Sequence, residues 1–493
     1  MSGERAQARG PCVRVAKLLA AGLLSCASLA LAAELAPLEP GRLWTPPDLP
    51  AEWRKLATEG TAAAATTPVP GRVYDLAALI DLAQLNNPET RIAWSEARQA
   101  AAGVGLTESM FLPRLSATVV GGYVESRWRP EVLGQPVNVD ASTRGVVPML
   151  TVEWLLFDFG QRAAADRAAR DVSLGANFLF NAMHQKLVYD VTRRYYEYGT
   201  AREQREIADE TLLNCEAVQA AVIARRRGGL ATSVEEAQAK QLVAQARLNK
   251  VTAAGLERST YQTLLATVGL PTRAELAVAS VRDLPLPSAK TFLAREALEQ
   301  ALATRPDILA SIAAFKAAEN ALESTRSDFL PKVFLVGFAL GGQGSMTIGP
   351  LSDLVNSSAS RGILLGITMP LYDGGMRASR EASAREQVTG AKARLDKVRN
   401  AAMSEIIVAS NLLDTALQSY EAASSLVETA TFTYGAALDA YREGFGTVTV
   451  ATEAANGVLA ARRARADAHA AALVAAASLA FALGEISGGE RRP

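Results

Sequence analysis

Histidine and net charge are both scarce in this chain of 493 residues. It holds only two histidines, His184 and His469, and equal numbers of basic and acidic side chains, 51 of each, so the formal net charge is zero. Neither histidine has a cysteine or an acid at metal-ligand spacing, and no phosphate-binding loop or nucleophile motif occurs. A nucleic-acid-binding protein carries a basic excess. We therefore expect no catalytic, cofactor or metal site and no nucleic-acid partner.

Cysteine, aromatic residues and long apolar runs are also few. Of the three cysteines, Cys12 and Cys26 lie close to the N-terminus, which leaves Cys215 alone in the rest of the chain and argues against an internal disulfide. Aromatic residues make up 6% of the chain, whereas alanine is abundant, as in closely packed helices. Past residue 32, no apolar run reaches the roughly 18 residues of a membrane helix. Stability is therefore expected to come from helix packing or oligomerisation.

The first 32 residues have the pattern of a secretory signal peptide. A basic segment precedes the apolar stretch Leu18 to Leu31, which is too short to cross a bilayer as a helix. Cleavage is expected after Ala32, and lipidation at Cys26 is the alternative, less favoured because a bulky leucine stands two residues before it. Residues 33–72, rich in proline and alanine, are expected to form a periplasmic arm.

One long unit occurs twice in the chain. Pro88 and Phe111-Leu112-Pro113 return 218 residues later as Pro306 and Phe329-Leu330-Pro331 (306 − 88 and 329 − 111). Further marks return 215 residues later: Gly160 as Gly375, Gly229 as Gly444, and Val268-Gly269 as Leu483-Gly484. This periodicity predicts a first repeat at 73–271, a connector at 272–291, a second repeat at 292–485 and a tail at 486–493.

Each repeat is predicted to contain a helix broken at its proline, two strands, a long helix and a second helix. In the first repeat we expect strands at about 115–124 and 146–157, a long helix from 161 to about 227, and a helix at about 233–268. In the second we expect strands at about 332–342 and 363–372 around a loop at 343–360, a long helix from 376 to about 442, and a last helix ending at 484. A helix of about 65 residues is about 100 Å long, which suits a tube better than a compact domain.

The long helix of the second repeat has a regular apolar seam. Apolar or small residues recur at steps of three and four, a spacing typical of coiled coils and helical bundles. The positions are Val388, Ala391, Leu395, Val398, Ala402, Ile406, Ala409, Leu413, Ala416 and Tyr420.

The four predicted strands, each about 10 to 12 residues long, have the length of tilted outer-membrane strands. Four strands cannot close a barrel, and an open sheet edge cannot face lipid. The strands therefore belong either to a soluble sheet or to a barrel built by several chains, and three chains would supply twelve strands.

The doubled motifs resemble the TolC-type outer-membrane factors over about residues 73–485. The segments that carry the resemblance are Asn86-Asn87-Pro88, the two Phe-Leu-Pro segments, Asp158-Phe159-Gly160-Gln161-Arg162 with Asp373-Gly374-Gly375-Met376-Arg377, and the terminal Leu483-Gly484. The resemblance implies a mainly α fold with a small β part, in which duplicated long-helix hairpins of a homotrimer form an α-helical tunnel. Four strands from each chain would complete a 12-stranded β-barrel in the bacterial outer membrane, in contact with its lipid, and the tunnel would extend into the periplasm.

The resemblance also implies that a periplasmic adaptor docks at the turn after each long helix. The residues of these two turns are Gly229 and Leu230 in the first repeat, and Gly444, Phe445, Gly446 and Thr447 in the second. The alternative is that these glycines only provide the backbone freedom of a tight helical hairpin.

An acidic ring at the closed aperture is a further implication of the resemblance. Glu235, six residues after Gly229, occupies the expected place in the first repeat, whereas the second repeat has Val450 there and Glu453 as the nearest acid. A three-fold ring of carboxylates would bind cations and repel itself. The alternative for Glu235 is a solvated first turn, where helix ends favour anions.

The function implied by the resemblance is a passive outer-membrane duct for the efflux of drugs and other toxic small molecules. An inner-membrane pump would drive export through the periplasmic adaptor, also called a membrane fusion protein. The alternative within the family is type I protein secretion with an ATP-binding-cassette (ABC) exporter. A hypothesis of another class is a soluble periplasmic coiled-coil scaffold, against which the four strands argue.

Overall fold

The computed structural model of the protein describes residues 68–69, 71–129, 131–132, 135–136, 139–287, 295–348 and 351–486. All of these residues belong to one compact unit, Thr66–Pro493. The expected signal peptide with Cys26, nearly all of the expected arm at 33–72, and residues 487–493 lie outside the described residues.

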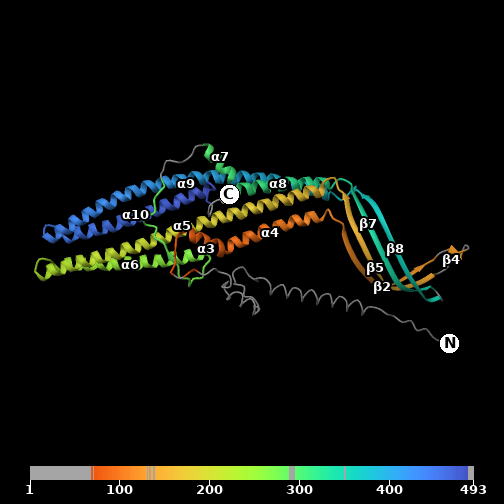
Figure 1. Ribbon diagram of the computed structural model, residues 1–493, viewed down its shortest axis with the longest axis horizontal. Coiled ribbons are helices and arrows are strands. Elements are labelled where there is room, and N and C mark those ends of the chain that lie inside the picture. The colour runs from red at the N-terminus through yellow and green to blue at the C-terminus, as the bar shows by residue number, and fades with distance from the viewer. Residues whose placement is uncertain are drawn as a thin grey trace, which may run out of the picture. The chain divides into compact units, whose positions relative to one another are not determined.

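The described elements follow the same order in both halves of the chain (Figure 1). The first half contains α3 (Leu76–Asn86), α4 (Pro88–Ser109), β2 (Arg114–Trp128), β5 (Val139–Phe157), α5 (Gln161–Arg227) and α6 (Ser233–Val268). The second contains α7 (Arg295–Thr304), α8 (Pro306–Ser327), β7 (Lys332–Ile348), β8 (Leu351–Thr368), α9 (Met376–Glu443) and α10 (Val448–Ala482). Four strands of two residues complete the set: β1 (Val73–Tyr74), β3 (Glu131–Val132), β4 (Gln135–Pro136) and β6 (Ala277–Val278).

Equivalent helices of the two halves have nearly equal lengths. The long helices α5 and α9 have 67 and 68 residues, which makes each about 100 Å long. Each begins after a glycine in the left-handed conformation, Gly160 at φ 90° and Gly375 at φ 89°. The duplicated fold predicted from the sequence is therefore confirmed, and the predicted bounds of the long helices and of the helices that follow them agree with the observed ones within two residues.

Each long helix packs along two shorter helices whose ends meet. The end of α6 lies against the junction of α3 and α4, where Asn87 Nδ2 donates a hydrogen bond to the carbonyl of Thr267 at 2.8 Å. Gly269 has φ 81°, and an added Cβ would lie 2.9 Å from the backbone of Asn86, so only glycine fits this close approach. In the second half, Arg305 makes the equivalent contact, donating from Nη1 to the carbonyl of Ala482 at 2.7 Å.

The predicted seam of α9 faces the protein interior. Six of its positions, Ala391, Ala402, Ile406, Ala409, Leu413 and Ala416, are buried, and the other four are half-buried. Part of this seam packs with α10, where Ala472 and Leu479 are buried in the same cluster. Alanine alternates with larger residues on this face, so the helices approach closely.

The four long strands form one antiparallel sheet in the order β2-β5-β7-β8. The central pair, β5 and β7, comes from different halves of the chain, so the sheet joins the two repeats. The pairing of β5 with β7 skips Val147 and Pro148, as expected where proline offers no backbone donor. Among the helices that the structure describes, none combines the length and the apolar character of a bilayer span.

The strands are longer than predicted, and the expected loop at 343–360 is wrong. β7 and β8 pair from Lys332–Thr368 to Ile348–Leu351, so most of this segment is strand. Its glycines and serines favour a loop by composition, but each residue gains a ladder partner once the two strands have begun to pair. β8 ends at Thr368 rather than at 372, because Pro370 cannot donate to the ladder.

Candidate functional site: the two hairpin tips

The first tip joins α5 to α6 through a turn of glycines. The helix ends when Gly229 adopts φ 75°, and the N–H of Leu230 donates to the carbonyl of Arg225 at 2.9 Å. This bond satisfies a carbonyl that the helix end would otherwise leave unpaired. The side chain of Leu230 is left projecting from the turn, with 71% of its surface exposed.

The second tip joins α9 to α10 in a similar way. Gly444 adopts φ 89°, and the N–H groups of Phe445 and Gly446 both donate to the carbonyl of Ala440, at 3.0 and 2.9 Å. Phe445 is 91% exposed. Thr447 then caps α10 by accepting a hydrogen bond from the N–H of Val450 at 3.4 Å. Both tips thus present one large apolar side chain to the surroundings.

Glu235 caps its own helix. The Oγ1 of Thr232 accepts from the N–H of Glu235 at 3.2 Å, and the carboxylate of Glu235 accepts from the N–H of Thr232 at 2.6 Å. This reciprocal pair is a capping box. The equivalent Val450 has no carboxylate, so α10 has only the threonine half of the motif, and Glu453 is exposed one turn further on. Local capping therefore engages the carboxylate of Glu235 in this single chain.

The two hairpins meet at Arg225 and Tyr441. The Nη1 of Arg225, on the last turn of α5, donates to the carbonyl of Tyr441 on α9 at 2.5 Å. The guanidinium also lies over the Tyr441 ring, 4.9 Å from its centre. Tyr441 is 1% exposed, and its hydroxyl has no hydrogen-bond partner among the described residues. Burial raises the pKa of Tyr441, and the negative charge of Glu235 raises it further.

Two of the three arginines before the first tip bond to different helices. Arg225 bonds to α9, as described above, while Arg226 forms an ion pair with Glu236 on α6. Glu236 also pairs with Lys240 at 2.6 Å. From the sequence, Glu236 is expected only in a first helical turn that favours anions, and the contact of Tyr441 is not indicated. The available signal for Tyr441 was an aromatic residue in the last turn before the second glycine.

A small buried cluster supports the tips from below. It takes residues from all four tip helices: Cys215, Val218 and Val222 of α5, Ala239, Leu242, Val243 and Ala246 of α6, Tyr441 of α9, and Val448 and Ala451 of α10. Burial raises the pKa of the Cys215 thiol, which packs here as a small apolar side chain. The two hairpins of one chain are therefore held together by apolar packing as well as by Arg225.

At the other end of the helices, the sheet has two free edges. β2 and β8 are the end strands of the four-stranded sheet, and neither has a second neighbour within the described residues. A Phe-Leu-Pro segment leads from a helix into the first strand of each half, and Phe157-Asp158 or Tyr372-Asp373 leads from the second strand into the long helix. There Arg162 donates from Nη1 to the carbonyls of Met110 and Leu155, at 2.9 and 2.7 Å.

This duplicated arrangement of helices and strands corresponds to a known family. The family model described as outer membrane efflux protein matches residues 79–270 and 297–485, which together are most of the chain. The chain belongs to the outer membrane efflux protein family.

Similar members of the outer membrane efflux protein family align over most of this chain. Protein CyaE of Bordetella pertussis (strain Tohama I) is 31% identical over 413 residues, which are 83% of this chain and 84% of CyaE. The pyoverdine export outer membrane protein OpmQ of Pseudomonas putida (strain KT2440) is 28% identical over 323 residues, 64% of this chain and 65% of OpmQ.

Solved structures of outer-membrane channels have the same fold. The outer-membrane channel OprN superposes with a TM-score of 0.71 at 18% identity, covering 83% of this chain and 89% of OprN. CusC, whose structures describe transmembrane channel formation, superposes with a TM-score of 0.69 at 21% identity, covering 83% of this chain and 91% of CusC. As a member of the outer membrane efflux protein family, the protein is an outer-membrane channel protein with a long periplasmic helical portion, and it is not an enzyme.

Proposed function

We propose that the protein is the passive outer-membrane duct of a tripartite export system. The observation that carries this proposal is the pair of exposed apolar tips at the ends of two helices that are each about 100 Å long. Leu230 and Phe445 are 71% and 91% exposed. Large apolar side chains exposed at the tips of the helical hairpins are typical of a protein-docking surface.

A homotrimer would complete the sheet. The free edges of β2 and β8 present unpaired backbone groups, which cannot face lipid. Pairing β2 of one chain with β8 of the next closes a barrel, and three chains supply twelve strands. The helices of the three chains would then enclose the periplasmic tunnel.

The tips would dock a periplasmic adaptor that connects the duct to an inner-membrane pump. Gly229, Gly444 and Gly446 shape the turns, while Leu230 and Phe445 supply the apolar contacts. Thr447 caps the helix that follows the second turn. A passive duct provides only an open path for the substrate. The energy for export would therefore come from the pump.

Opening of the duct would require the helical tips to move apart in an iris-like shift. The contact of Arg225 with Tyr441 ties α5 to α9 and opposes such a movement within one chain. In the trimer, Glu235 and Glu453 are proposed to contribute carboxylates near the aperture. For Glu235 this would require a side-chain rotation out of its capping box.

Small-molecule efflux is the proposed transport role. The family name and the pyoverdine export relative support this choice. Secretion of proteins by a type I system is the alternative, and the identity of the inner-membrane partner would distinguish the two.

Photo-crosslinking in cells tests the proposal. A photoreactive residue would replace Leu230 or Phe445, and trapped partners would be identified by mass spectrometry. Leu213, which is 67% exposed on the side of α5 about 20 Å from the tip, is the matched control. We expect both tips, and not Leu213, to trap an adaptor. An adaptor encoded with an ABC exporter and a secreted protein would replace efflux by secretion, and no adaptor at either tip would refute docking there.

A further inference from the structure

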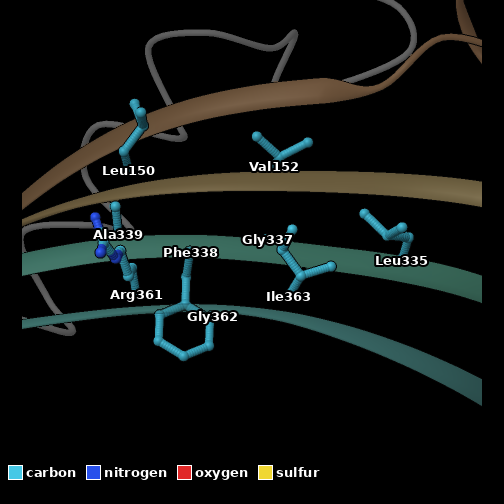
Figure 2. A pocket seen from close by; sticks show the side chains of 9 residues that line it. All are labelled: Leu150, Val152, Leu335, Gly337, Phe338, Ala339, Arg361, Gly362 and Ile363. Atoms are coloured by element: carbon cyan, nitrogen blue, oxygen red, sulfur yellow. The ribbon is translucent and has the colours of Figure 1, made fainter.

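One face of the sheet has a hollow of about 470 Å³ (Figure 2). Its base is the β7 segment around Gly337 and Ala339, where side chains are absent or small. Val152 of β5 borders it on one side and Ile363 of β8 on the other. Arg361 lies beside Ala339 in the β7–β8 register and lines the same hollow. The volume is within the range of sites that take small organic ligands.

The hollow lies on the apolar face of the sheet. Ile363, Leu365 and Ile367 alternate along β8 on this face and are 77%, 68% and 72% exposed. The opposite face mixes apolar side chains, such as Leu364, with polar ones, including Arg114 and Glu153, which form an ion pair at 3.9 Å. Outer-membrane strands turn apolar residues toward lipid and polar ones toward the lumen. The hollow therefore faces the lipid.

Arg361 lies at the boundary of the apolar band that is farther from the helices. Beyond the strand end at Thr368, the apolar residues Met369 and Leu371 are also exposed, and Leu371, 88% exposed, lies ten residues from Arg361 (371 − 361). A tilted strand crosses the bilayer core in roughly 9 to 11 residues. Because the helices are periplasmic, Arg361 lies at the level of the outer leaflet's head groups.

Arg361 has no protein partner in the described part of the chain. Its side chain is exposed, and no hydrogen bond, ion pair or ring contact joins it to another described residue. Arg144, another exposed arginine of the same face, instead lies over the Tyr123 ring, 5.8 Å from its centre. A guanidinium at a membrane boundary is suited to a phosphate, which accepts two parallel N–H bonds.

We propose that this hollow binds one phosphate-bearing lipid of the outer leaflet. The lipid phosphate accepts hydrogen bonds from Arg361, and an acyl chain lies over Gly337 and Ala339 between the ridges of Val152 and Ile363. The apolar walls match the chain, and the unpaired positive charge matches the head group. This site goes beyond the duct function but rests on the proposed trimeric barrel, which places this face of the sheet in the membrane.

The test compares two lipids that share their acyl chains. Phosphatidylglycerol carries a phosphate, and glucosyl diacylglycerol does not. Binding of each to the full-length protein in detergent would be titrated by native mass spectrometry. We expect Arg361→Gln to weaken phosphatidylglycerol binding about tenfold, the effect of one charge-assisted hydrogen bond, and to leave the glycolipid unaffected.

Two further variants distinguish the acyl-chain part of the site from its phosphate part. In Gly337→Val, the first added carbon would lie 3.7 Å from Val152 Cβ, an ordinary contact, so the larger side chain fits and fills the hollow. We expect this variant to weaken the binding of both lipids. Arg144→Gln is the matched control, since Arg144 lies outside the hollow. It should leave the binding of both lipids unchanged.

Three results would overturn the proposal. The first is equal binding of the two lipids by the unaltered protein. The second is a loss of phosphatidylglycerol binding in Arg144→Gln that is as large as the loss in Arg361→Gln. The third is displacement of the lipid by inorganic phosphate, which would indicate a site for free anions. Circular dichroism of each variant confirms folding, and unchanged channel conductance separates this site from the duct function.

Discussion

Replacing Asp158 by alanine is expected to lower the free energy of unfolding by about 3–5 kcal/mol per chain. Asp158 and Arg162 form an ion pair at 2.8 Å, and their side chains are only 7% and 8% exposed. Without the carboxylate, a buried guanidinium loses its counter-charge. The hydrogen bonds of Arg162 to the carbonyls of Met110 and Leu155 hold it in place, so it cannot turn toward water to escape this cost.

The second repeat provides an internal control. Asp373 and Arg377 form the equivalent pair at 2.6 Å, but the Asp373 side chain is 18% exposed. In the described residues, Arg377 donates to no carbonyl and only lies over the Phe329 ring. The Arg377 side chain is as buried as that of Arg162, but no carbonyl of the described residues holds its guanidinium in place, so it can turn toward water once the carboxylate is removed. Asp373→Ala is therefore expected to cost clearly less than Asp158→Ala.

Urea unfolding of the full-length protein in detergent, followed by far-ultraviolet circular dichroism, measures these differences. A double-mutant cycle with D158A and R162M should give a coupling energy of about 2 kcal/mol or more. A D158A variant within about 0.5 kcal/mol of the unaltered protein, the range of ordinary surface substitutions, would contradict this expectation. So would a D158A variant that costs no more than Asp373→Ala.

Three other changes have defined expectations. Arg225→Met removes the bond and ring contact with α9, so the open tip should become about tenfold more populated, measured as channel open time in planar bilayers; an unchanged open time contradicts this restraint. In Gly446→Ala the added carbon lies 3.0 Å from backbone, so unfolding should be easier by about 1–3 kcal/mol, whereas Gly457→Ala, with open space around it, should not destabilise the protein in the same melt. The hydrogen bond from the Lys332 ammonium lowers the pKa of Asp328 below its usual value, so the stabilisation by this carboxylate is present above the usual pKa and is lost as the pH falls through the lowered one. Asp328→Asn should therefore weaken the pH dependence of the urea midpoint in acid. An unchanged pH dependence in this variant would contradict the expectation.

Local signals in the sequence determined the duplication and the long helices. Pro88 and Pro306 begin helices, and Gly229 and Gly444 end them, because these residues restrict or free the backbone wherever they stand. The seam from Val388 to Tyr420 has a period that only a helix satisfies. Such features depend on neighbours along the chain, so they can be read without the fold.

Contacts between distant residues required the tertiary structure. Arg225 and Tyr441 are 216 residues apart, and no local pattern relates them. The extension of β7 and β8 through 343–360 depends on pairing, which overrides the loop preference of glycine and serine. The hollow beside Arg361 exists only because the strand register places Ala339 and Arg361 side by side. Register and packing are set by the sum of many weak contacts across the whole sheet, and a single segment does not contain that information.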